Sequence, residues 1–450
     1  MPAWEEILKL SSYLLRTRRK VASSAFWIGL ITSLIGGILL NQMMIMNSQD
    51  ADNQKLEDQI STLVERAEFL QESGEYEESI KFCEEALKQE PGLKSRASIG
   101  YGRLYQTMGN AYRSLSSIRD TELNLRKSMF YYEEALDAFS GHGQKATSIE
   151  HANCESDLGK AYMYLAEVRE KETNLDLAID HFQHALLALD PKRHPLEHAS
   201  VQNNLGSAYQ LRSEVRGKEE NLNRSIQAYG DALKICTLEE YPEDFANIQY
   251  NLGSAYQILS EVRDQEANLN LSIQAYQNAL EIRTLETYPL DYADIQNNLG
   301  TSYTYLSEVM DREVNLNYAL HSYTEALKIF DSDKYPLARA TVQVNLGYVY
   351  LLQSGITNPK ENLEKSITAS LAALQVYNLE DYPLDYANLK INLAKAYLAL
   401  AVIQDGKKNL EMALSSCQDA LQIYTEESYP LYHEEAQKDL ELIKEAMLSS

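Results

Sequence analysis

Apolar positions between residues 100 and 450 repeat on two scales. Locally they fall three or four residues apart, which is the spacing of a helix that buries one face. On a longer scale, Leu-Gly-Ser-Ala-Tyr at residues 205–209 returns at 252–256, and its glycine position recurs every 47 residues from Gly159 to Ala394. Periods of about 20–50 residues are typical of stacked units that cannot bury their apolar faces alone. The pattern therefore predicts an all-α array of helical hairpins.

Each repeating unit is predicted to contain two helices joined by a turn. Between units, proline follows tyrosine, as at Tyr241-Pro242. Proline suits the first position of a helix because its missing N–H would have no partner there. Asn221 and its equivalents precede the second amphipathic run, where an asparagine side chain can cap the helix N-terminus. We therefore expect helix A to begin at the proline and helix B to begin at the asparagine.

Small and aromatic residues recur where these helices are expected to pack. Gly206 and its equivalents are predicted to let helix A lie close to helix B, where a side chain would clash. Tyr209 and its equivalents are predicted to fill the space between neighbouring hairpins. No helix B follows the last proline, Pro430, so the final segment is predicted to be a cap that closes the apolar core.

The motif Leu-Gly-x-x-Tyr, followed by Ala/Ser-x-x-x-Phe/Tyr-x-x-Ala, resembles the tetratricopeptide repeat. The segment 67–91 is similar to the standard repeat of about 34 residues, and the later 47-residue units resemble the Asn-Leu-Gly type of kinesin light chains and of bacterial and archaeal arrays. The resemblance covers residues 55–450. It implies a right-handed superhelical solenoid of antiparallel hairpins, in which helix A lines a concave face that binds peptides.

A long uncharged segment precedes the repeats. Residues 21–48 contain no charged side chain and supply the roughly 20 apolar residues that cross a bilayer. A cleaved signal peptide is the alternative, but its apolar region is shorter and ends at a small-x-small site. The sequence therefore predicts the following parts: a basic head at 1–20, a transmembrane anchor at 21–46, a linker and first short repeat at 47–94, seven long repeats at 95–428, and a capping helix at 429–450.

The flanking charges predict the orientation of this segment. Basic residues at 16–20 precede it and acidic residues at 50–58 follow it, which predicts a single-pass membrane protein with a cytoplasmic N-terminus and an extracytoplasmic repeat domain. Gly29, Ser33 and Gly37 share one helical stripe through which two copies could form a homodimer. The alternative is that small residues are simply common in membrane helices.

Composition excludes several classes of function. The chain carries 41 Lys+Arg against 66 Asp+Glu, a net charge of −25, which argues against nucleic acid as a partner. The four cysteines form no paired motif, so neither a disulfide framework nor a zinc site is indicated. No catalytic or phosphate-binding motif is present, so we expect no cofactor and no enzymatic activity. His181 and His184 share a helix face in the histidine-rich region 142–198; metal binding there is an alternative to packed or solvated histidines.

Candidate binding residues lie two positions before the repeated glycine of helix A. In peptide-bound relatives an asparagine at this position holds the ligand backbone, since its amide has a donor and an acceptor. The alternative is that each asparagine bonds a neighbouring hairpin. The five predicted residues are Asn204, Asn251, Asn298, Asn345 and Asn392.

Other positions of the same face differ between the two ends of the array. A basic end that could hold an acidic group of the ligand is predicted near Arg103, Asn110, Arg113 and Lys160. The middle is neutral and contains Gln210 and Gln257.

The sequence thus favours a membrane-anchored scaffold that binds an extended segment of a protein partner in its concave groove. One alternative is a structural assembly factor for a membrane protein complex, and another is a regulatory subunit of an enzyme.

Overall fold

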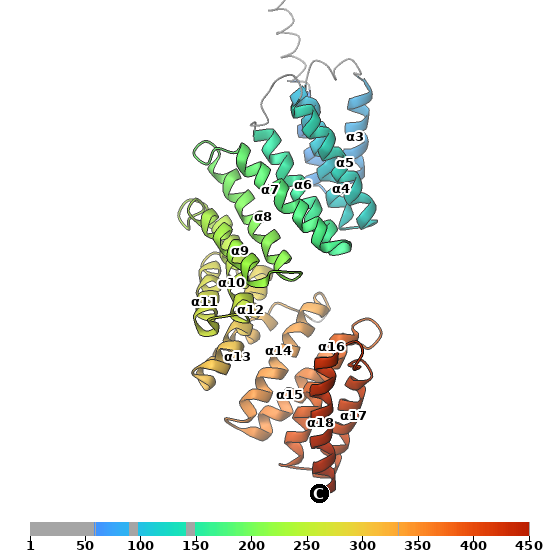
Figure 1. The fold of residues 1–450 in the computed structure, drawn as a ribbon, viewed down its shortest axis with the longest axis vertical. Helices are drawn as coiled ribbons and strands as arrows, with labels where there is room; N and C mark the ends of the chain where they lie inside the picture. The colour runs from blue at the N-terminus through green and yellow to red at the C-terminus, as the bar shows by residue number, and fades with distance from the viewer. Residues whose placement is uncertain (1–57, 59, 90–97, 141–148, 332, 450) are drawn as a thin grey trace, which may run out of the picture. The chain divides into compact units, whose positions relative to one another are not determined.

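The computed structural model describes residues 58, 60–89, 98–140, 149–331 and 333–449. Throughout these ranges the chain forms helices and short connections, without a strand, so the predicted all-α class is confirmed (Figure 1). The chain divides into two compact units, 1–161 and 162–450. Because the cut falls inside one helix, α6 (Ile149–Val168), this helix contributes residues to both units.

The first unit begins with a helix at 60–72, followed by α3 (Tyr76–Gln89), α4 (Ser98–Ser116) and α5 (Thr121–Ser140). Helices α4 and α5 form a hairpin, and α3 packs against α4. Buried Ala67, Leu104 and Met108 belong to their shared core.

The second unit is a row of hairpins in chain order. Each A helix packs against its own B helix and against the B helix before it, so the core is continuous from hairpin to hairpin. Its helices are α7 (Lys171–Ala188), α8 (Pro195–Ser213), α9 (Lys218–Leu233), α10 (Pro242–Ser260), α11 (Gln265–Leu280), α12 (Pro289–Val309), α13 (Arg312–Leu327), α14 (Pro336–Ser354), α15 (Pro359–Ala373), α16 (Pro383–Ala401), α17 (Gly406–Leu421) and α18 (Pro430–Ser449).

The predicted start of helix A is confirmed. A proline occupies the first turn of α8, α10, α12, α14 and α16, and a tyrosine or histidine precedes it at the N-cap position. The last described helix, α18, packs on α16 and α17, and its role as a cap stays a prediction. The handedness of the superhelix stays a prediction.

The predicted start of helix B is wrong by three residues. Helix α9 begins at Lys218, and the N-cap residue before it, Gly217, has a φ of 57° and makes no side-chain cap hydrogen bond. Asn221 therefore lies one turn inside the helix, and its Nδ2 donates to the carbonyl oxygen of Arg216 at 2.7 Å. A left-handed residue reverses the chain so tightly that helix B starts at once. The buried asparagine then satisfies a carbonyl group left open at the end of helix A.

The tight packing expected at the repeated glycine is confirmed. A Cβ placed on Gly206 would lie 2.6 Å from the ring of Tyr229, and one on Gly253 would lie 2.8 Å from the ring of Tyr276. These tyrosines belong to helix B and are about 1% exposed. Glycine on one helix and tyrosine on the other thus form a single packing unit, of which the sequence pattern predicts only the glycine part.

The tyrosines of helix A lie between neighbouring hairpins, as predicted. The hydroxyl of Tyr209 accepts a hydrogen bond from Gln183 of the preceding hairpin at 3.1 Å, and Arg224 of its own hairpin lies over the ring. Tyr303 accepts a hydrogen bond from Gln277 of the preceding hairpin at 3.2 Å. Neighbouring hairpins are therefore joined by polar contacts as well as by the core.

The predicted localisation is corrected. Of the helices that the structure describes, none combines the length and the apolar character needed to span a bilayer. This finding contradicts a single-pass membrane protein with an extracytoplasmic repeat domain, and that prediction is not retained. The described helices are amphipathic because their apolar residues face other helices of the array. The predicted anchor at 21–46, including Gly29, Ser33 and Gly37, lies outside the described residues.

Candidate functional site

The second unit contains a groove with a volume of about 550 Å³ along helices α12, α14, α16 and α18. These are A helices and the capping helix, so the 47-residue register places equivalent positions of each helix side by side along it. Lys395 occupies the position on α16 that Tyr348 occupies on α14, and Glu435 occupies the position on α18 that Asn388 occupies on α16. The lining residues are Thr301, Thr304, Tyr305, Tyr323, Val344, Asn345, Tyr348, Asn388, Ile391, Asn392, Lys395, Tyr424, Tyr432, Glu435 and Ala436.

Three of the five predicted asparagines make a hydrogen bond to the preceding A helix. Each donates its Nδ2 to a side chain 48 residues earlier, which is the alternative to ligand binding that the sequence left open. The pairs are Asn251 with Asn203, Asn298 with Tyr250, and Asn345 with Asn297, each at 3.0 Å. In the unbound chain these donors therefore join hairpins, and their role toward a ligand stays a prediction.

The asparagines at the two ends of this column differ from the middle three. The Nδ2 of Asn204 is buried without a hydrogen-bond partner. The residue 48 positions before Asn392 is Val344, which offers no acceptor, and within the described part of the chain the amide of Asn392 makes no side-chain hydrogen bond. Since Asn392 lines the groove, it is the predicted residue whose amide is open to a ligand.

The two predicted glutamines also connect hairpins. Gln210 donates its Nε2 to the hydroxyl of Ser254 at 2.9 Å. Gln257 accepts a hydrogen bond from the hydroxyl of Ser302 at 3.2 Å and one from Tyr276 at 3.3 Å. Neither glutamine lines the groove along α12–α18.

The predicted basic end belongs to the first unit, and its cations have partners there. Arg103 pairs with Glu150 at 3.1 Å, and Lys160 pairs with Asp157 at 3.1 Å. Both charges are thus balanced before any ligand binds.

The other two residues of that end share one partner. Arg113 donates its Nε to the hydroxyl of Tyr132 at 3.1 Å, and the same hydroxyl donates to Asn110 at 2.7 Å. Tyr132 is fully buried beside Gly109, so this network holds the α4–α5 hairpin together.

Two lining residues of the groove, Lys395 and Tyr348, interact with carboxylates close to them. The Nζ of Lys395 lies 3.6 Å from a carboxylate oxygen of Asp439. Burial raises the pKa of Asp439, and the positive charge of Lys395 lowers it in part. Burial likewise raises the pKa of Tyr348, and a hydrogen bond to the carboxylate of Glu308 adds to that rise.

Sequence reasoning missed Tyr305, Asn388, Tyr432 and Glu435. The last two lie on α18, which had been read only as a cap. The register was the available signal, because Glu435 is 47 residues after Asn388 and Asp439 is 47 residues after Asn392. Tyr424 and Tyr432 stack with ring centroids 5.1 Å apart, and the hydroxyl of Tyr424 donates to Asn388 at 2.5 Å.

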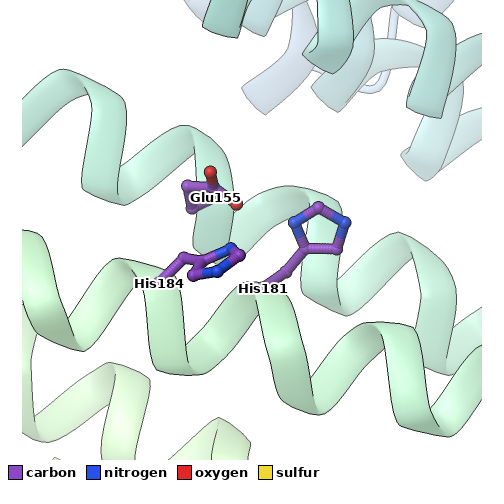
Figure 2. A group of neighbouring side chains, drawn as sticks. All are labelled: Glu155, His181 and His184. Carbon is purple, nitrogen blue, oxygen red and sulfur yellow. The ribbon is translucent and has the colours of Figure 1, made fainter. Parts of the chain in front are cut away.

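The histidine pair of the second unit has a packing role. His181 and His184 lie one turn apart on α7, with ring centroids 6.4 Å apart (Figure 2). His181 also stacks on Tyr162 at 5.3 Å. Figure 2 labels Glu155 of α6 as well, but that residue belongs to the first unit. Metal binding by these histidines stays the alternative interpretation that the sequence offers.

No protein-family model matches the chain, and no curated protein matches it. Among solved structures, the C-terminal part of a TPR repeat-containing protein from Cytophaga hutchinsonii is 14% identical, with 70% of this chain and 95% of that one covered and a TM-score of 0.42. RapI in its apo form is 14% identical over 86% of this chain and 97% of its own, with a TM-score of 0.49. BtubC from P. vanneervenii is 20% identical over 56% and 90%, with a TM-score of 0.38. At these scores we infer nothing about partner or activity from the likeness.

Proposed function

We propose that this chain is a protein–protein interaction scaffold and that its groove along α12, α14, α16 and α18 binds an extended segment of a partner protein. The observation that carries the proposal is the lining of the groove, which consists mainly of tyrosine, asparagine, threonine and aliphatic side chains, with Lys395 and Glu435 as its charged members. Within this proposal the chain binds its partner and does not act on it chemically.

The lining suits a polypeptide backbone. A side-chain amide carries a donor and an acceptor, as a peptide group does, so Asn392 can hold a ligand independently of the ligand's side chains. Tyrosine rings offer apolar area and a hydroxyl group at little cost in conformational entropy. Tyr305 and Tyr348 therefore supply contact area in the lining of the groove.

The length of the groove favours an extended segment over a compact ligand. Neighbouring helices pack on the order of 10 Å apart, so four helices in a row span about 30–40 Å. An extended chain rises about 3.3 Å per residue, so about ten to twelve residues would follow the groove from end to end.

Selection of peptides by the full chain tests the proposal. A phage-displayed library of random peptides of about twelve residues, matched to the groove length, is enriched on the wild-type protein. The Kd values of the enriched peptides are then measured by calorimetry for wild type and for Asn392→Ala. We expect a loss of about fivefold to tenfold for Asn392→Ala, because one backbone hydrogen bond is removed.

Asn270→Ala is the matched control. Asn270 is exposed on a B helix, where its Nδ2 donates to the carbonyl oxygen of Glu266 in the same helix at 2.9 Å. Asn270→Ala therefore removes a side-chain amide, as Asn392→Ala does, but outside the groove. Enriched peptides that bind wild type and Asn392→Ala with the same Kd would refute the groove assignment.

A further inference from the structure

Charge around the groove is incompletely balanced. The carboxylates near the lining include Glu308, which accepts from Tyr348, Asp439, which pairs with Lys395, and Asp385, whose charge acts on Tyr424. Glu435 is part of the lining itself. The positive charges that act there are Lys395 and Arg312, whose charge reaches Tyr348. Lys395 is the cation of the lining and it pairs with Asp439, so no lining cation is paired with Glu435.

Glu435 is the carboxylate that belongs to the lining of the groove. This side chain is exposed on α18, lines the groove, and forms no ion pair with any described residue. Its neighbour Lys438 pairs with Glu434 instead, at 2.7 Å. Glu435 therefore lines the groove without an ion pair, and the charge of Lys438 acts on it only from a distance, since Lys438 pairs with Glu434.

An aromatic ring lies one helical turn before this carboxylate. Tyr432 and Glu435 are three residues apart on α18, so their side chains neighbour each other on one helix face. Tyr432 is 53% exposed, while its ring stacks on Tyr424 with an angle of 19° between the planes. Because Tyr424 is itself bonded to Asn388, the ring of Tyr432 is held in place with much of its surface open to solvent.

We propose that Tyr432 and Glu435 form a subsite for one arginine side chain of the bound segment. A guanidinium group is planar, stacks on an aromatic face, and matches a carboxylate with two parallel N–H donors. Lysine meets the carboxylate only as a point charge, so arginine fits this pair better. This inference rests on the proposed function, since it adds a side-chain preference to the backbone contacts of the same groove.

Two labelled peptides test the subsite on the full chain. One is fluorescein-(Gly-Ser-Arg)4, and the other carries citrulline, the neutral isostere, at every arginine position. Fluorescence anisotropy is measured at an ionic strength of about 0.15 M, which screens charges more than about 8 Å away. We expect the arginine peptide to bind about tenfold more tightly, from a cation–π contact and an exposed ion pair together.

Glu435→Gln should bring the two peptides to within about twofold of each other. Glu441→Gln is the matched control, because it makes the same charge change on the same helix. Six residues separate the two positions, so Glu441 lies on another face, and it does not line the groove. Far-UV circular dichroism verifies that both variants keep the helical content of wild type.

Three outcomes separate this subsite from the proposed function. Equal loss of arginine selectivity in both glutamine variants would assign it to the general negative charge of the chain and overturn the subsite. Equal Kd values for the two peptides on wild type, both raised by Asn392→Ala, would overturn the subsite and leave the groove in place. Equal Kd values for the two peptides on wild type, neither changed by Asn392→Ala, would overturn the subsite together with the groove.

Discussion

The central and C-terminal hairpins of the second unit differ in the side chain that helix B places opposite the repeated glycine position of helix A. In the central hairpins, the helix B position opposite the repeated glycine holds Tyr229, Tyr276 or Tyr323, all fully buried. In the last two hairpins the same position holds Ser370 and Cys417. The central hairpins thus fill the space beside glycine with a ring, whereas the C-terminal ones leave it to small side chains.

The asparagine column changes over the same stretch. Asn251 and Asn298 donate hydrogen bonds to the preceding helix, while Asn392 faces Val344 and has no acceptor there. Within the groove, Asn345 keeps its hydrogen bond to Asn297, whereas Asn392 lacks the equivalent bond. The same repeated position can therefore hold an internal hydrogen bond in one hairpin and an open amide in the next.

The largest difference in stability between the two regions should appear when the buried tyrosine ring of a central hairpin is removed. Tyr276→Ala deletes a buried aromatic side chain and leaves a cavity, so we expect the free energy of unfolding to fall by about 3–5 kcal/mol. Ser370→Ala, at the equivalent position, removes a buried hydroxyl that has no hydrogen-bond partner and should change stability by less than about 1 kcal/mol. Urea unfolding followed by circular dichroism measures both.

Similar losses in Tyr276→Ala and Ser370→Ala would contradict the contrast between the regions. Ser272→Ala serves as a size-matched control in the central region. That hydroxyl is buried and makes a hydrogen bond with Ser302 at 2.9 Å, so its removal should cost about 1 kcal/mol.

Alkaline pH should weaken the central hairpins through the same rings. Burial raises the pKa of Tyr229 to about 12 and that of Tyr323 to about 12, from an ordinary value of 10.0. The neutral phenol is therefore favoured in the folded state. Its contribution to stability is fully present below pH 10 and is lost as the pH rises through about 12. Helical content at 222 nm and tyrosinate absorbance at 295 nm should change together in this window.

Tyr323→Phe sharpens this test because it keeps the ring and removes the titrating hydroxyl. The variant should show a shallower fall of the urea midpoint between about pH 10 and about pH 12 than wild type does. If the urea midpoint of the wild-type protein stayed constant across this pH window, buried neutral tyrosines would be ruled out.

The smallest difference is expected in the asparagine column. Asn298→Ala removes the donor to Tyr250 and should lower the free energy of unfolding by about 1 kcal/mol. Asn392→Ala should leave stability within about 0.5 kcal/mol of wild type, because it breaks no hydrogen bond within the described chain. The same urea titrations measure both variants, and an equal loss in each would contradict the assignment of Asn392 to a ligand.

Much of the architecture was predictable from the sequence because its physical causes are local. Proline at the start of helix A is visible as a residue type, and so is the repeated glycine. The start of helix B was mispredicted because a left-handed residue sets it. That residue is Gly217 in one hairpin and Asp264 in the next, so no single residue type reveals it.

The site was less predictable, since it depends on what lies across from each repeated residue. Asn298 and Asn392 are identical in sequence and in register, yet one faces Tyr250 and the other Val344. Only pairing positions 48 residues apart distinguishes them. Likewise the contribution of α18 follows from continuing the register past the last complete repeat, to Glu435 and Asp439.

The constant 47-residue register also bears on how this chain can change in length. Each hairpin contacts mainly its neighbours, and α8, α10 and α12 present equivalent residues to the helix before them. Duplication or loss of one whole unit, such as residues 242–288, would join surfaces that already match. The groove, built from α12 onward, would be left untouched. The length of the array and the lining of its groove can thus evolve independently.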